Sequence, residues 1–115
     1  MAELTILHNP RCSKSRAALD AVGDDARVVQ YLKEPLDEAQ LLDLLSKLTD
    51  DPAALVRRDR LFTELGLRDE DVRSAEQVAA LLAEHPRLME RPVLIRGDAA
   101  IIGRPTDRIA AFLAR

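Results

Sequence analysis

The residues of this chain best suited to chemistry form one short stretch, His8-Asn9-Pro10-Arg11-Cys12-Ser13-Lys14-Ser15-Arg16. It holds the only cysteine, Cys12, and three basic side chains close to it, Arg11, Lys14 and Arg16. The reactive form of a cysteine is the thiolate, which nearby cations and the N-terminus of a helix both stabilise. Unpaired N–H groups at a helix start also bind tetrahedral oxyanions. The stretch therefore predicts a nucleophilic cysteine beside an anion site rather than an inert buried thiol.

The segments on either side place Cys12 at a turn between a strand and a helix. Residues 4–8 form an apolar run typical of a strand, and Asn9-Pro10 ends it. Apolar residues then recur at helical spacing over 13–22. A second strand is predicted within 27–32, so strand, helix and strand form a parallel βαβ unit.

The middle of the chain reads as a helical insertion. Asp37 with Gln40, and Ser74 with Gln77, have the spacing of capping boxes, and each pair precedes an apolar stripe of helical period. Residues 50–71, which lie between these two predicted helices, are less regular and contain one short helical segment.

The last third of the chain predicts a hairpin followed by a helix. Strands are expected at 92–95 and 99–102, and Gly97-Asp98 between them is a tight-turn pair. A final helix is expected to open at 104–106. The whole order is βαβ, helical insertion, then ββα, which is typical of a thioredoxin-like α/β fold with a mixed four-stranded sheet.

The position of the cysteine fits this fold class. Thioredoxin-like proteins carry a redox C-x-x-C motif, which appears here as Cys12-Ser13-Lys14-Ser15 with serine in the second cysteine position. A thiolate without a second cysteine must form a mixed disulfide or an adduct that another thiol clears.

The composition narrows the class of protein. The chain has 115 residues, of which 47% are hydrophobic and 32% charged, so we expect one globular domain over 1–115. A net charge of −3 gives no reason to expect nucleic acid as a partner.

A lone cysteine forms no internal disulfide, no apolar run approaches the length of a membrane span, and the first residues lack a basic leader. We therefore expect a cytoplasmic protein without a membrane partner. The histidines, His8 and His85, lack cysteine partners, so no metal site is expected.

These motifs together resemble the ArsC family of glutaredoxin-coupled arsenate reductases, and in particular a single-cysteine subgroup with the same basic stretch. The resemblance spans nearly the whole chain in order. Besides residues 9–16 it is carried by Tyr31-Leu32-Lys33-Glu34-Pro35, Ala54-Leu55-Val56-Arg57-Arg58, Glu64-Leu65-Gly66-Leu67, His85-Pro86, Leu88-Met89-Glu90-Arg91-Pro92-Val93 and Ile102-Gly103-Arg104-Pro105. Arg11, Ser13 and Lys14 replace the smaller, less basic residues found in the best-studied members.

The resemblance implies an arsenate reductase and assigns its main groups. Cys12 is implied as the nucleophile that forms a thiolate–arsenic adduct. Arg57, Arg91 and Arg104 are implied as the arginines that hold the arsenic oxyanion, and a guanidinium suits this task because it is always charged and offers paired donors. Glutathione is implied as co-substrate and glutaredoxin as partner, with no bound cofactor.

Further residues near the cysteine are weaker site candidates. His8, when protonated, would stabilise the thiolate, or it is a strand-end histidine satisfied by backbone groups. Ser15 donates its hydroxyl to the thiolate or faces the core, and Arg16 is a further candidate for anion binding. By resemblance the Arg91–Pro92 bond is a candidate for the cis form, which X–Pro bonds tolerate. Solvated surface charges are expected at Arg58, Arg60 and Arg108.

Two other functions fit the same residues. A glutathione-dependent thiol oxidoreductase acting on mixed disulfides would need Cys12 but less of the arginine set. A redox-responsive module that binds a partner protein is the second alternative, because the resemblance extends to regulators of RNA polymerase. Those regulators typically carry C-x-x-C, which Ser15 interrupts here.

Overall fold

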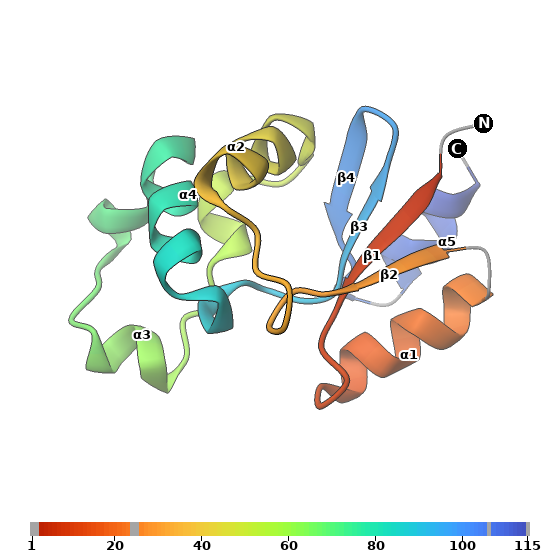
Figure 1. Ribbon diagram of the computed structural model, residues 1–115, viewed down its shortest axis with the longest axis horizontal. Helices are drawn as coiled ribbons and strands as arrows, with labels where there is room; N and C mark the ends of the chain where they lie inside the picture. The colour runs from red at the N-terminus through yellow and green to blue at the C-terminus, as the bar shows by residue number, and fades with distance from the viewer. Residues whose placement is uncertain (1–2, 24–25, 106, 115) are drawn as a thin grey trace.

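The computed structural model describes residues 3–23, 26–105 and 107–114. Four strands form one sheet in the order β2-β1-β3-β4 (Figure 1). Strand β1 (Leu4–His8) pairs in parallel with β2 (Ala26–Gln30) and antiparallel with β3 (Val93–Arg96), which in turn pairs antiparallel with β4 (Ala99–Ile102). The predicted mixed four-stranded sheet is confirmed.

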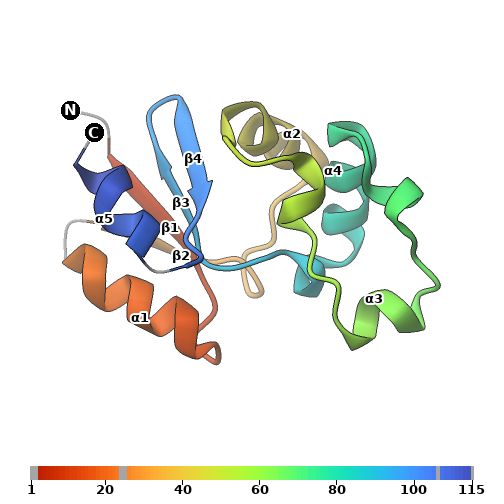
Figure 2. The ribbon, with the colours of Figure 1, turned by 180° about the vertical axis from the view of Figure 1, so that it is seen from behind.

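Helix α1 (Ser13–Val22) connects the two parallel strands, and helix α5 (Asp107–Leu113) ends the described fold. Both helices cover the same face of the sheet (Figures 1 and 2). Side chains alternate along β1, so that one set faces these helices and the other set faces away. The core on this side is formed by Leu4, Ile6, Ala18, Val22, Leu94, Ile101, Ile109 and Phe112.

The opposite face of the sheet packs against the helical insertion. Helices α2 (Glu38–Lys47) and α4 (Ala75–Glu84) pack on each other and begin at the two predicted capping boxes, both of which are formed. The sequence between them folds into 3₁₀ helix η2 (Pro52–Leu55), the short helix α3 (Arg60–Glu64) and 3₁₀ helix η3 (Asp69–Val72). Figure 2 shows α3 at the end of the molecule away from the sheet.

Two strands differ slightly from the predicted bounds. The second strand ends at Gln30, because its carbonyl accepts hydrogen bonds from the N–H groups of Lys33 and Glu34 and so closes a turn. Tyr31 is therefore a turn residue, although its ring is buried in the core. The third strand begins at Val93 rather than one residue earlier.

The C-terminal elements match the prediction closely. Strands β3 and β4 form the expected hairpin, in which Gly97 at the turn has φ 58°, a value that favours glycine. The last helix begins at Asp107, and Thr106, one of the residues expected to open it, lies outside the described residues. None of the helices in the described part of the chain is long and apolar enough to cross a membrane.

Candidate active site

The turn that carries Cys12 is built from local hydrogen bonds. The Asn9 side chain accepts a hydrogen bond from the N–H of Arg11, and the N–H of Cys12 donates to the Asn9 carbonyl. Each donor–acceptor distance is 3.0 Å. These bonds close the chain immediately after β1 and bring Cys12 to the N-cap position of α1. Asn9 is thus a turn-forming residue, as the sequence predicts, and the cysteine sits at the positive end of the helix dipole.

Cys12 is poised to ionise near neutral pH. Partial burial raises the pKa of its thiol, but the backbone N–H groups of Ser15 and Lys14 and the guanidinium of Arg91 act in the opposite direction and lower this pKa to about 7. An ordinary cysteine titrates near pH ~8.5. About half of the Cys12 side chains are therefore thiolate at pH 7, which is the form that attacks an electrophile.

His8 and Ser15 form a buried pair beneath the turn. The His8 Nδ1 lies 2.8 Å from the Ser15 hydroxyl, which also accepts a hydrogen bond from the N–H of Asn9. Burial lowers the pKa of His8, and the charge of Arg16 adds to this effect although an interaction with the Ser15 backbone partly offsets it. His8 is therefore neutral at pH 7.

The side chains of both residues contact each other, and the roles expected of them at the thiolate stay predictions. The Ser15 hydroxyl faces His8 and the core, and its side chain is completely buried. The backbone N–H of Ser15, in the first turn of α1, contributes to the lowered pKa of Cys12.

A small antiparallel bridge brings Arg57 next to the segment that contains Arg91. Val56 pairs with Met89, the N–H of Arg57 donates to the Leu88 carbonyl, and the N–H of Glu90 donates to the Leu55 carbonyl. Leu55, Val56, Leu88 and Met89 are all buried, so apolar packing fixes this bridge. The two arginines are 34 positions apart in sequence, and the bridge between their neighbours sets their separation in space.

Arg104 reaches Cys12 by an extension of the β3–β4 hairpin. Beyond the strands the N–H of Gly103 still donates to the Pro92 carbonyl at 2.8 Å, which aligns Arg104 with Arg91. The Arg104 Nε donates to the Arg91 carbonyl at 2.7 Å, and its Nη2 lies 3.3 Å from the Cys12 sulfur. The Arg91–Pro92 bond is cis, as the resemblance allowed, and so is Arg104–Pro105.

Glu90 is a residue of this site that the sequence reasoning did not single out. Its Oε1 lies 3.7 Å from the Nε of Arg57 and 3.7 Å from the Nε of Arg104, so one carboxylate neutralises part of the charge of both arginines. Glu90 belongs to the motif Leu88-Met89-Glu90-Arg91-Pro92-Val93 that carries the family resemblance, and its place directly before Arg91 could have pointed to it. The sequence alone does not show which cations an acidic side chain will contact.

Three further arginines contact backbone carbonyls, acidic side chains or solvent. Arg16 donates to the Pro10 carbonyl at 2.9 Å and so ties helix α1 to the turn, and it is not among the residues that line the cavity described below. Arg60 is solvated, as expected, with 92% of its side chain exposed. Arg108 was wrongly expected to be solvated, because it pairs with Asp50 at 3.0 Å and donates to the Ile102 carbonyl.

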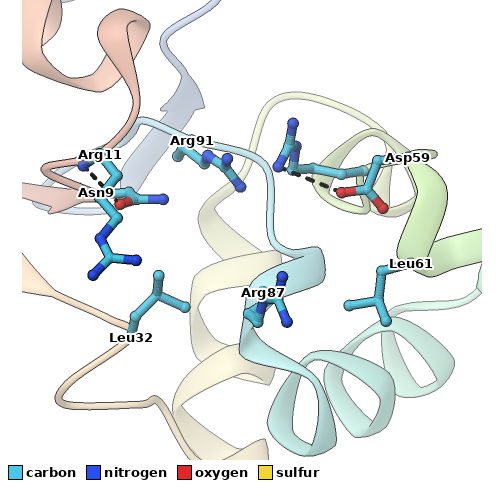
Figure 3. Close-up of a pocket in the computed structure, with 8 residues that line it drawn as sticks. Asn9, Arg11, Leu32, Asp59, Leu61, Arg87 and Arg91 are labelled. Carbon is cyan, nitrogen blue, oxygen red and sulfur yellow. Dashed lines mark hydrogen bonds and ion pairs between the residues drawn. The ribbon is translucent and has the colours of Figure 1, made fainter.

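A cavity of about 250 Å³ opens beside the cysteine turn, between it and the helical insertion (Figure 3). Four arginines line it: Arg11, Arg57, Arg87 and Arg91. Among the described residues that line it, Asp59 is the one acidic side chain, and it pairs with Arg57 at 3.5 Å. The cavity is therefore strongly basic in a chain whose net charge is negative.

Near the cavity the Tyr31 hydroxyl and the Arg91 Nε are both buried without a hydrogen-bond partner among the described residues. Burial raises the pKa of Tyr31, although the positive charges of Arg91 and Arg57 act to lower it. The phenol is thus neutral. Within the described ranges no group of three or more histidine, cysteine or acidic side chains is arranged to hold a metal ion.

Comparison with known proteins places these features in a family. The profile of the ArsC family matches residues 7–112. An arsenate reductase from Neisseria meningitidis is 42% identical over 118 aligned positions, which cover 98% of this chain and all of the relative.

Two solved structures share the fold. A putative arsenate reductase from Yersinia pestis is 37% identical with a TM-score of 0.82, and the match covers 94% of this chain and 98% of that one. An arsenate reductase from Vibrio cholerae is 33% identical with a TM-score of 0.82, covering 96% and 97%. This chain is thioredoxin-like in fold and belongs to the ArsC family.

Proposed function

We propose that this chain is an arsenate reductase in which the Cys12 thiolate attacks the arsenic of a bound oxyanion. The observation that carries the proposal is the contact between the Cys12 sulfur and Arg104 Nη2 at 3.3 Å, made where the N-terminus of α1 and Arg91 already favour the thiolate. A nucleophile and an anion-binding guanidinium thus meet at one point. The arsenate reductases among the relatives support the choice of anion.

Three arginines are suited to hold the substrate. Arg57, Arg91 and Arg104 come from three segments that converge around Glu90 and Cys12. Planar guanidinium groups offer paired donors to a tetrahedral oxyanion, and they stay charged at any pH of interest. Their positive charge also stabilises the negative charge that builds up on the oxyanion as the thiolate attacks.

The reaction proceeds through adduct formation, reduction of arsenic by glutathione, and regeneration of Cys12. The thiolate forms a sulfur–arsenic bond, and one arsenate oxygen leaves as water after it takes up protons. Glutathione then attacks this adduct, and two electrons from the two sulfur atoms reduce arsenic(V) to arsenic(III). Arsenite leaves, and Cys12 remains as a mixed disulfide with glutathione, which glutaredoxin reduces by thiol–disulfide exchange.

The need for an outside thiol follows from the chain itself. Cys12 is the only cysteine, and the C-x-x-C partner position is held by the buried Ser15. No second thiol of this chain can resolve an adduct on Cys12. We therefore propose glutathione and glutaredoxin as reductants, and a cytoplasmic setting, where such thiols are kept reduced.

Arsenate-dependent NADPH oxidation tests the proposal, in an assay coupled to glutathione, glutaredoxin and glutathione reductase with direct detection of arsenite. The wild-type chain should form arsenite, and Cys12→Ser should form none above background. Arg104→Gln should lower kcat/KM by about 10²- to 10³-fold, the usual loss for one donor to an oxyanion. Arg60→Gln is the matched control, because it removes an arginine whose side chain is 92% exposed and pairs with Glu64 on the surface, and it should retain activity.

A wild-type chain that forms no arsenite, yet becomes glutathionylated at Cys12, would overturn the proposal. That outcome would favour the thiol oxidoreductase alternative, in which the arginines serve another anion. Retention of arsenite formation by Cys12→Ser would contradict the mechanism itself.

A further inference from the structure

The basic cavity is lined by two of the proposed substrate arginines, Arg57 and Arg91, and by two further arginines. Arg11 comes from the cysteine turn, and Arg87 comes from 3₁₀ helix η4 (Pro86–Leu88) in the insertion. In Figure 3, Arg11 and Arg91 lie on the side of the cysteine turn, Asp59 and Leu61 lie on the opposite side, and Arg87 lies between them. Arg11 and Arg87 thus line the same cavity as Arg91.

The guanidinium groups of Arg11 and Arg87 have no partners among the residues that the structure describes. Within residues 3–23, 26–105 and 107–114, neither side chain forms an ion pair or a hydrogen bond, and only the backbone N–H of Arg11 is bonded. Arg57 in the same cavity is, in contrast, paired with both Asp59 and Glu90. Two unpaired cations facing one cavity are available to an anionic ligand.

The size of the cavity also exceeds what an oxyanion requires. Its volume of about 250 Å³ corresponds to roughly eight water molecules at about 30 Å³ each. A tetrahedral oxyanion has only five heavy atoms and leaves much of this space unfilled. The cavity wall is also apolar at Leu32 and Leu61 and acidic at Asp59. The cavity can therefore contact negatively charged, apolar and positively charged groups of one ligand.

We propose that this cavity binds the reducing co-substrate, a small peptide thiol with two carboxylates such as glutathione, through Arg11 and Arg87. Each guanidinium takes one carboxylate, Asp59 takes the free ammonium group, and the two leucines contact the peptide's methylene groups. The inference rests on the proposed function, because it assigns a binding site to the thiol that reduces the arsenic adduct. Arg91 links this cavity to the nucleophile, since it lines the cavity and also lowers the pKa of Cys12.

Binding can be measured without chemistry by titrating the chain with S-methylglutathione, whose blocked sulfur cannot react, and following backbone amide shifts by NMR. The wild type should show saturable shifts at 9–11, 57–61 and 87–91. Arg11→Gln and Arg87→Gln should each raise Kd by about threefold to tenfold, as expected for loss of one partly solvated charge-assisted contact. Arg60→Gln, which changes the net charge equally but lies outside the cavity lining, should change Kd by less than twofold.

Two comparisons make the test specific for carboxylates. The diethyl ester of S-methylglutathione keeps the peptide backbone but lacks the two negative charges, and it should bind at least tenfold more weakly. Raising the salt concentration should weaken the free acid more than the ester, because exposed ion pairs are screened. Equal Kd values for acid and ester, or equal Kd values for wild type, Arg11→Gln and Arg87→Gln, would overturn the proposal.

Steady-state kinetics separate a failure of this inference from a failure of the proposed function. If the chain reduces arsenate, Arg11→Gln and Arg87→Gln should raise KM for glutathione by a larger factor than KM for arsenate. An unchanged KM for glutathione in both variants would overturn the thiol site while the reductase stands. Binding of S-methylglutathione as described, with no arsenite formed, would support the thiol site and refute the arsenate assignment.

Discussion

Replacing Arg91 with glutamine should raise the pKa of Cys12. In the wild type, Arg91 lowers this pKa both by hydrogen bonding and by its charge, and it acts together with the N–H groups of Ser15 and Lys14. The helix N–H groups remain in the variant, so we expect a value between about 7 and the ordinary ~8.5, a rise of about one unit. The thiolate fraction at pH 7 should fall from about one half to about one tenth.

The assay is the rate of alkylation by iodoacetamide as a function of pH, measured by mass spectrometry. Because Cys12 is the only cysteine, the whole signal belongs to it. The wild-type profile should have its midpoint near pH 7, Arg91→Gln near pH 8, and the control Arg60→Gln near pH 7. A wild-type midpoint near 8.5, or the same midpoint in wild type and Arg91→Gln, would refute the electrostatic account of the turn.

Three further changes test other parts of the structure. Ser15→Ala removes the buried hydroxyl that bonds His8 and Asn9, so the free energy of unfolding in urea should fall by about 1–3 kcal/mol; an unchanged midpoint would contradict this. Alkaline titration of Tyr31, the only tyrosine, should show an absorbance midpoint above 10. Because burial favours the neutral phenol, the free energy of unfolding should fall as pH rises above about 10. An absorbance midpoint at pH 10 would argue against burial of the hydroxyl. Gly103→Ala places a methyl group 3.0 Å from two buried side chains and should cost about 1–3 kcal/mol of stability in the same urea assay, whereas full stability would show that the core can yield.

Local signals in the sequence predicted most of the architecture. The turn after β1 follows from Asn9, whose side chain closes it, and the hairpin follows from Gly97, which adopts positive φ. The capping boxes at Asp37 and Ser74 begin helices where expected. These features succeed because each depends on residues close together in the chain, so the sequence itself contains the interacting groups.

The site was less predictable because its contacts join distant segments. Glu90 faces Arg57 because the bridge between Val56 and Met89 holds their segments side by side, and it faces Arg104 from the far end of the chain. Arg108 finds Asp50 across 58 positions of sequence, and no local pattern indicates that pairing. The charge state of His8 likewise depends on how deeply the end of β1 is buried, which its neighbours in sequence do not reveal.

The most direct test of the central claim is a single-turnover experiment with stoichiometric protein, glutathione and arsenate, without glutaredoxin. Arsenite and glutathionylated Cys12 are counted in the same sample, the first by arsenic speciation and the second by mass spectrometry. If arsenic is reduced through an adduct on Cys12, one arsenite should appear for each glutathionylated Cys12. Glutathionylation without arsenite, or arsenite formed while Cys12 stays unmodified, would contradict the account.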